Sequence, residues 1–266
     1  ITDASEEFKE EINEHLQIAF DEETIKVDLT SELKDVYKEY QQEIIVPSNQ
    51  KSNIRLIDAI SKGLRESMER YDNLIIMGQD VAEYGGVFKI TEGFANQFGR
   101  DRVRNTPICE SAIVSAAYGA SLNGMKAVME MQFADFVSSG FNPIVNLLAK
   151  SNYRWNQNAD VVVRLPCGAG GGAGRFHSQT NEAWFTKTPG LKVVYPAFPE
   201  DAKGLLCAAI NDPNPVLFFE HKALYRSVYQ EVSDDYFTVE LGKASLLREG
   251  DDVTIISYGA GVHWAI

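Results

Sequence analysis

The sequence predicts an α/β fold in which a mostly parallel sheet is covered by helices on both faces. Strand patterns alternate with helix patterns through most of the chain, and this alternation is typical of a parallel sheet. Several strand patterns are continuous apolar runs, such as residues 74–77 and 161–165, as expected of strands buried on both faces. With 266 residues, 44% of them hydrophobic, the chain can form one large domain, or one domain with additional pieces.

Residues 1–52 are predicted to form an acidic helical arm and a linker. Residues 1–43 contain 14 acidic and 4 basic side chains and so carry most of the net charge of −13. Apolar residues recur at every fourth position from Phe8 to Phe20, which predicts an amphipathic helix over residues 5–20. A shorter amphipathic piece is expected over residues 33–40, followed by an extended linker over 44–50.

The central domain is predicted to span residues 53–232. Asn53 is a good helix cap, and the apolar spacing after it predicts a helix that ends near residue 72. Further helices are expected at residues 92–98, from Glu110 onward, at 136–152 and at 199–210. Strands are expected at residues 74–77, 126–132, 161–165, 192–195 and 216–220, and a further strand is expected through Val103.

Beyond residue 232 the pattern changes, and residues 233–266 are predicted to be the start of a second α/β domain. Apolar runs at 241–247 and 253–259 indicate strands, and a helix is expected from Gly261. These strands would lack partners, so we expect the sequence to be part of a longer chain.

The composition argues against several classes of protein. No basic patch is present that would neutralise the phosphates of a nucleic acid. No run of about 18 apolar residues is present, and the acidic amino terminus differs from a signal peptide. Three widely spaced cysteines, Cys109, Cys167 and Cys207, indicate neither a disulfide framework nor a zinc site. We therefore expect a cytoplasmic protein that binds neither nucleic acid nor a membrane.

Glu110 is the first candidate for chemistry. It follows an extended segment that ends at Pro107, and it opens a predicted helix rich in small residues. In a parallel sheet, a strand-to-helix junction of this kind lies at the edge where ligands bind. An acid in the first turn of a helix is also favoured by the helix dipole, so its position alone leaves a purely structural role open.

His177 is the second candidate, because a histidine on a polar loop can transfer protons near neutral pH. A surface position without a function is an equal alternative. The glycines of residues 168–174 favour a loop that needs positive φ over a phosphate-binding loop, since no helix follows at once. Phe136 is a candidate aromatic wall beside Glu110, although core packing is the commoner use of a phenylalanine.

Six motifs follow one another between residues 53 and 232. They are Gly78-Gln79-Asp80-Val81-Ala82-Glu83-Tyr84-Gly85-Gly86, Asn105-Thr106-Pro107-Ile108-Cys109-Glu110, Met131-Gln132-Phe133-Ala134-Asp135-Phe136, His177-Ser178-Gln179, Pro189-Gly190-Leu191-Lys192-Val193-Val194 and Asn211-Asp212-Pro213-Asn214-Pro215. Their order and spacing resemble the beta subunit of the thiamine-diphosphate-dependent decarboxylating component of 2-oxo acid dehydrogenase complexes. The acidic arm resembles the end of an alpha part, as in the bacterial form that fuses alpha and beta.

This resemblance implies a transketolase pyrimidine-binding-domain-like fold, followed by the start of a transketolase C-terminal-like domain. It also implies roles for individual residues. Glu110 would hydrogen-bond the aminopyrimidine ring of thiamine diphosphate, and His177 would assist acyl transfer to a lipoyl group. Ile108, Gln132 and Phe136 would bind the cofactor with Glu110. A structural monovalent cation, such as potassium, would be bound by Asp212 and Asn214 together with backbone oxygens near Val161, Val162 and Ala209.

The implied activity is oxidative decarboxylation of a 2-oxo acid, pyruvate or branched-chain, with transfer of the acyl group to lipoamide. The magnesium and diphosphate motif is absent from this sequence. The resemblance therefore implies that an alpha part holds magnesium and that this chain is inactive alone. Expected partners are the alpha part and a lipoyl-bearing acyltransferase, in a homodimer or an alpha2beta2-like assembly.

Two alternatives remain open. A transketolase-like or deoxyxylulose-phosphate-synthase-like enzyme would share the fold and the glutamate, but it would need several basic or histidine residues for a sugar phosphate. A non-catalytic assembly fragment would share the fold alone, and the loss of Glu110 or His177 would have favoured it. Both residues are present.

Overall fold

A computed structural model describes residues 2–266, so Ile1 of the predicted arm lies outside the described residues. The chain divides into two compact units, residues 1–33 and 34–266. The first unit contains the helix α1 (Thr2–Asp21), which confirms the helix predicted over residues 5–20. Its apolar stripe is exposed, since Phe8 and Phe20 are 61% and 77% accessible.

The helix predicted over residues 33–40 is misplaced. The structure has α2 at Leu29–Asp35, because Asp28 accepts a hydrogen bond from the backbone N–H of Thr30 and so caps a helix that begins earlier.

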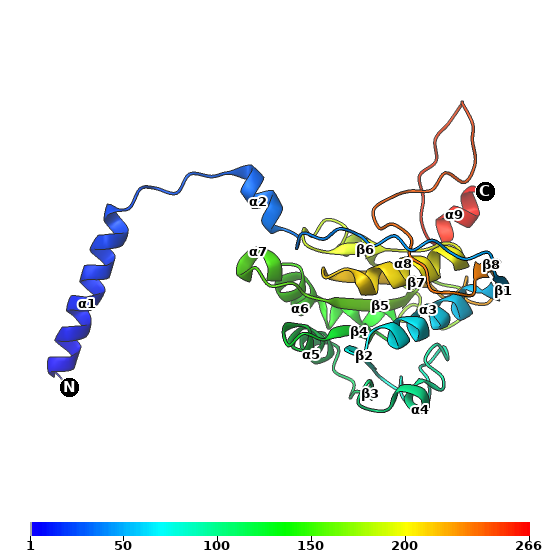
Figure 1. The fold of residues 1–266 in the computed structure, drawn as a ribbon, viewed down its shortest axis with the longest axis horizontal. Helices are drawn as coiled ribbons and strands as arrows, with labels where there is room; N and C mark the ends of the chain where they lie inside the picture. The colour runs from blue at the N-terminus through cyan, green and yellow to red at the C-terminus, as the bar shows by residue number, and fades with distance from the viewer. Residues whose placement is uncertain (1) are drawn as a thin grey trace. The chain divides into compact units, whose positions relative to one another are not determined.

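A six-stranded parallel sheet forms the centre of the second unit, in the order β3-β2-β4-β5-β7-β6 (Figure 1). Neighbouring strands are in register at Ile76, Val128, Val162 and Val216. The sheet confirms the predicted fold class. Its strands are β2 (Leu74–Gly78), β3 (Val103–Asn105), β4 (Lys126–Glu130), β5 (Val161–Cys167), β6 (Lys192–Val194) and β7 (Val216–His221).

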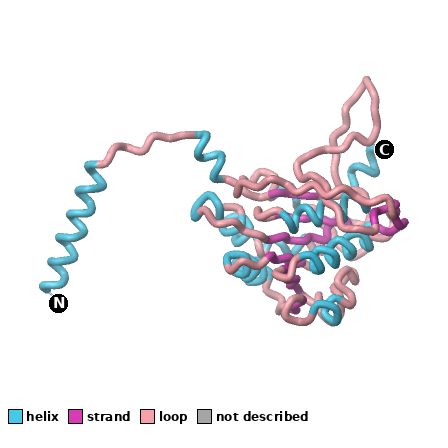
Figure 2. The backbone as a smooth tube through the Cα atoms, in the orientation of Figure 1, coloured by secondary structure: helices cyan, strands magenta, loops and turns pink. Residues whose placement is uncertain are grey.

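Helices cover both faces of this sheet (Figure 2). Alternate residues of β2 enter different cores: Leu74 and Ile76 pack with α3 and α8, whereas Ile75 and Met77 pack with α5. Burial on both faces explains why the strands are continuous apolar runs. The main helices are α3 (Leu56–Arg70), α4 (Phe94–Phe98), α5 (Glu110–Leu122) and α8 (Pro199–Asn211), with a short turn η3 at Glu182–Trp184.

A small antiparallel pair of strands was missed by the sequence prediction. Strand β1 (Lys51–Arg55) pairs with β8 (Tyr229–Ser233), and Asn53 lies opposite Glu231. Asn53 is therefore a strand residue and not the helix cap that we predicted. The helix α3 begins at Leu56 instead, where the Asp58 carboxylate accepts the backbone N–H of Arg55 at 3.2 Å.

The single helix predicted over residues 136–152 is wrong, because the region is four short pieces. Gly140 and Pro143 interrupt it, and around Ala149 the bonding becomes π-type, with the Ala149 N–H donated to the Ile144 carbonyl. The pieces are η1 (Ala134–Ser138), α6 (Phe141–Pro143), η2 (Ile144–Leu148) and α7 (Ser151–Trp155). The strand predicted to reach residue 132 also ends earlier, at Glu130.

The strands predicted at 241–247 and 253–259 do not form. These segments are irregular, and only the short helix α9 (Ala260–Ala265) follows them. A strand needs a neighbour to satisfy its backbone groups, and neither segment pairs with another strand among residues 2–266. Phe237 is fully buried, so the chain beyond residue 232 still packs on the central unit, and the predicted boundary at residue 232 stays a prediction. Within residues 2–266, no helix combines the length and apolar character needed to cross a membrane.

Candidate functional site

The carboxyl ends of β2 and β4 lie side by side, because Gly78 is in register with Glu130. The residues that follow each strand therefore meet at one edge of the sheet. The Gln132 side-chain amide donates to the Asp80 carboxylate at 3.4 Å, which links the two strand ends. This is the edge at which parallel sheets bind ligands.

Glu110 lies at this edge as the first residue of α5 and is half-buried. The extended segment before it is fixed to β2, because Thr106 donates its backbone N–H to the Gly78 carbonyl at 2.9 Å. Gln79, only 7% exposed, donates its side-chain amide to Glu110 Oε1 at 3.3 Å. Sequence reasoning placed Gln79 in a polar loop and did not identify it as the partner of Glu110.

An apolar residue precedes this acid by two positions in the chain. Ile108 is 82% exposed, which is high for a large aliphatic residue. A lone carboxylate beside an exposed apolar side chain is a suitable environment for a flat heterocycle with a ring nitrogen.

His177 and Phe136 come together in the structure. The His177 ring lies edge-on to Phe133, with centroids 4.7 Å apart, and to Phe136 at 5.5 Å. Phe136 and Phe133 also contact each other edge-on. His177 is half-buried, so its ring has an aromatic wall on one side. The predicted site residues on the 132–136 and 177 motifs are thus neighbours.

Asp135 binds the backbone of the two residues that follow His177, and sequence reasoning did not identify it as a site residue. Its Oδ1 accepts the backbone N–H groups of Ser178 and Gln179 at 3.0 and 3.1 Å. Asn181 reaches the same segment and donates its side-chain amide to the Ala134 carbonyl at 3.0 Å. An acid inside the apolar 131–136 stretch was the available signal, since buried carboxylates are rare unless they are bonded.

A buried ionic network lies behind the strand ends. Arg164 on β5 forms ion pairs with Glu130 at 2.6 Å and with Glu220 at 2.7 Å, and these side chains are at most 3% exposed. Tyr225 donates its hydroxyl to Glu220. Burial raises the pKa of Glu130, and the nearby Arg164 guanidinium opposes this rise. The network lies among buried strand residues, which makes it a support for the strand ends.

The glycine run at 168–174 is shaped by close neighbours. Gly168 has a φ of +79°, and a Cβ at this position would lie 2.2 Å from the His221 ring nitrogen Nε2. Only glycine fits there, for both backbone and steric reasons. This favours the interpretation of the run as a loop that needs positive φ.

The residues predicted to bind a monovalent cation lie at the opposite edge of the sheet. Val161 and Val162 begin β5, while Asp212 and Asn214 precede β7, and Ala209 lies in the last turn of α8. Asp212 is fully buried, and its Oδ2 forms an ion pair with the ammonium of Lys192.

The other side-chain oxygens at this edge accept hydrogen bonds from protein N–H groups. Asp212 Oδ1 accepts the backbone and side-chain N–H groups of Asn214, both at 2.9 Å, and Asn214 Oδ1 accepts the N–H of Lys38 at 2.7 Å. These side chains therefore do not fit a cation in this arrangement. Within residues 2–266, no cluster of three His, Cys, Asp or Glu side chains is placed to hold a metal.

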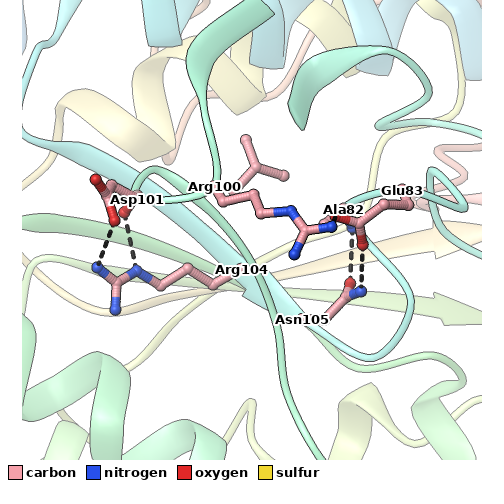
Figure 3. Close-up of a pocket in the computed structure, with 7 residues that line it drawn as sticks. Ala82, Glu83, Arg100, Asp101, Arg104 and Asn105 are labelled. Carbon is pink, nitrogen blue, oxygen red and sulfur yellow. Dashed lines mark hydrogen bonds and ion pairs between the residues drawn. The ribbon is translucent and has the colours of Figure 1, made fainter. Parts of the chain in front are cut away.

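A pocket of about 330 Å³ lies beside the edge strand β3 (Figure 3). Asn105 forms part of it by accepting the Ala82 N–H at 2.8 Å and donating to Glu83 at 2.9 Å, and Arg100 pairs with Glu83. None of the predicted site residues lines this pocket. Its lining residues are Ala82, Glu83, Arg100, Asp101, Val103, Arg104 and Asn105.

Comparison with known proteins adds a family to this geometry. Residues 52–228 match the family described as "Transketolase, pyrimidine binding domain". The chain is 49% identical over 212 residues to the 2-oxoisovalerate dehydrogenase subunit beta of Bacillus subtilis, covering 79% of this chain and 65% of that protein. It is 44% identical over 216 residues to the pyruvate dehydrogenase E1 component subunit beta of the same organism, covering 80% and 66%. The chain thus spans about two thirds of the length of these relatives.

A solved structure agrees on the fold. The chain resembles a split-gene transketolase, described as an inactive beta4 tetramer, with a TM-score of 0.51 and 22% identity. The match covers 64% of this chain and 51% of that one, and at this identity it supports the fold alone.

Proposed function

This chain belongs to the family of transketolase pyrimidine-binding domains, and on that premise we propose that it is the beta part of a thiamine-diphosphate-dependent 2-oxo acid dehydrogenase. Relatives at 49% and 44% identity are named as beta subunits of 2-oxoisovalerate and pyruvate dehydrogenases. The likeness to a transketolase structure concerns the fold and does not favour a sugar-phosphate substrate. The substrate is a 2-oxo acid, either pyruvate or a branched-chain one.

The placement of Glu110 is the observation that carries this proposal. Its carboxylate lies at the carboxyl edge of the sheet, with Gln79 on Oε1 and the exposed Ile108 nearby. These residues fit the aminopyrimidine of thiamine diphosphate, which presents a ring nitrogen on a flat apolar body. When bound, this cofactor supplies the nucleophile and the electron sink for decarboxylation.

The residues of this chain then have distinct tasks. Glu110, the first residue of α5, would share a proton with the ring nitrogen. Ile108, Phe136 and Gln132 would hold the ring and exclude water from it. His177, held against Phe133 and Phe136, donates or accepts a proton during acyl transfer to the lipoyl group.

Other components complete the proposed enzyme. An alpha part supplies magnesium and the diphosphate site, so this chain alone is inactive. A lipoyl-bearing acyltransferase takes the acyl group. The assembly is a homodimer or alpha2beta2-like, with contacts through α5, whose small residues permit close approach, and through residues 141–152. All three cysteines are free thiols, which suits a reducing compartment such as the cytoplasm.

The experiment that tests this function uses the chain alone and the chain combined with its alpha part. Calorimetry with thiamine diphosphate and magnesium should show tight binding only in the combined protein. Decarboxylation of pyruvate or a branched-chain 2-oxo acid should be lost in Glu110→Gln and retained in the control Glu69→Gln, which changes an exposed acid on α3. Binding and turnover that do not depend on Glu110 would instead favour a non-catalytic assembly role.

The monovalent cation implied by the resemblance is tested separately, because the ammonium of Lys192 already neutralises Asp212. A potassium ion at Asp212 requires this ammonium to move away. We expect the Tm of the wild type to be the same in potassium and choline chloride. Lys192→Met should lower the Tm, since it leaves a buried carboxylate unpaired, and potassium should partly restore it. A wild-type Tm that rises specifically with potassium would favour a resident ion.

A further inference from the structure

The loop that carries His177 is fastened to the 133–136 segment directly after the histidine. Asp135 Oδ1 accepts the N–H groups of the two residues that follow His177, Ser178 and Gln179. Asp135 is only 8% exposed, so the accepting side of these bonds is shielded from bulk water. Hydrogen bonds to a carboxylate are stronger than neutral ones, and water competes less for them at a buried site.

The same segment also contacts the histidine ring. Phe133 and Phe136, on either side of Asp135 in sequence, lie edge-on to the ring at 4.7 and 5.5 Å. One short segment therefore fixes both the backbone after His177 and the plane of its imidazole. The bonds join residues 43 and 44 positions apart, so they hold the loop to the sheet edge.

A buried cation lies next to this arrangement. Asp135 Oδ2 and the ammonium of Lys222 are both buried without a hydrogen-bond partner in the described structure. The ammonium lies 5.3 Å from the centre of the Phe133 ring. Burial lowers the pKa of Lys222, and Cys167 and Asp135 act in the opposite direction. Lys222 is thus a basic group that acts electrostatically on Asp135 without a direct hydrogen bond.

We propose that Asp135 is a positioning residue that presents His177 for acyl transfer to the lipoyl group, an assignment that rests on the proposed function. In this transfer one sulfur of the lipoyl disulfide bonds to the acyl carbon, the S–S bond breaks, and the other sulfur takes up a proton that His177 delivers. The bond between the acyl carbon and the group that carried it then breaks, and the hydroxyl proton on that carbon leaves as the thioester forms. The disulfide gains two electrons from the substrate, which is oxidised. Asp135 acts by fixing the position of the His177 ring and does not contact the reacting atoms.

The test separates decarboxylation from acyl transfer in the protein combined with its alpha part. Decarboxylation is followed with ferricyanide as the electron acceptor, and acyl transfer with a lipoylated domain. Asp135→Ala should reduce acyl transfer by about 10- to 100-fold while the ferricyanide rate changes by less than about 3-fold. Asp135→Asn keeps an acceptor oxygen and should restore part of the transfer rate. The control Asp101→Ala, at an exposed acid before β3, should change neither rate.

Two further measurements distinguish positioning from a general structural role. Amide hydrogen exchange at Ser178 and Gln179 should accelerate by about 10-fold in Asp135→Ala, whether or not cofactor is bound. Adding Asp135→Ala to His177→Ala should cause no further loss of acyl transfer, since both changes remove the same function. Parallel loss of both rates, additive effects or unchanged exchange would overturn the proposal. A wild type that fails to decarboxylate would overturn the proposed function itself.

Discussion

A neutral amide, and not a cation, holds the carboxylate of Glu110. Gln79 is buried at the end of β2, and its amide points at Oε1 across 3.3 Å. An arginine or lysine in this place would stabilise the charged acid strongly and weaken its ability to share a proton. The amide orients the carboxylate at a smaller electrostatic cost. Gln79 therefore supports the proton-sharing role proposed for Glu110.

Gln79→Leu is expected to slow decarboxylation by about 3- to 10-fold, because it removes one hydrogen bond of about 0.5–1.5 kcal/mol from the acid. The rate should be measured in the combined protein at saturating substrate. Gln157→Leu, on an exposed residue, is the control and should leave the rate unchanged. An undiminished rate in Gln79→Leu would show that Glu110 is oriented by other contacts.

At the scale of elements, the helix α8 is packed unusually closely against the segment after β8. A Cβ at Gly204 would lie 2.5 Å from Val239 Cγ2 and 2.6 Å from Phe237 Cε2. Phe237 is fully buried and cannot easily move aside. The glycine therefore permits a contact that joins residues on both sides of the boundary predicted at residue 232.

Gly204→Ala is expected to destabilise the fold by about 1–3 kcal/mol, since overpacking outweighs the gain of about 1 kcal/mol in helix propensity. The free energy of unfolding is obtained from urea titration. Gly119→Ala in α5 is the matched control, because a Cβ there meets nothing within 4 Å. It should stabilise the fold by about 0.5–1 kcal/mol. Equal effects at the two glycines would contradict this packing.

At the scale of the whole molecule, buried acids make stability depend on pH. Asp160 lies at the start of β5 and pairs with Lys126 at 2.9 Å, and both side chains are at most 17% exposed. Burial raises its pKa to about 6, although Lys126 opposes this rise. The folded state then binds a proton more tightly than the unfolded state does. This group stabilises the fold at low pH, and its contribution falls as pH rises from about 4 to about 6.

Asp160→Asn should remove this decline, which is at most about 3 kcal/mol. Lys126 keeps a partner in the variant, because it also donates to the Ile210 carbonyl at 3.0 Å. Stability is measured as the urea midpoint of unfolding at pH 4.5 and at pH 6.5. The proteins compared are the wild type, Asp160→Asn and the exposed control Asp101→Asn. A difference between the two pH values that is the same in all three proteins would rule out a role for Asp160.

The sequence by itself determined the α/β class, the central strands and the start of the Glu110 helix. These features depend on local patterns: continuous apolar runs such as residues 74–77, and a helix start after Pro107. The residues proposed to act on the cofactor or the acyl group were also found in the sequence, from local patterns and by resemblance to a family, whereas Gln79 and Asp135 were not. Their roles remain proposals, although the structure brings His177 and Phe136 into contact.

Only the tertiary structure decided the features that depend on residues far apart in the chain. The pairing of β1 with β8 turned a predicted helix cap at Asn53 into a strand residue. Asp135 accepts a hydrogen bond from the loop after His177, and Lys192 forms an ion pair with Asp212. No local sequence pattern specifies either of these partners. A side chain's periodicity predicts the face on which it lies, but the group that it meets there depends on how distant segments pack together.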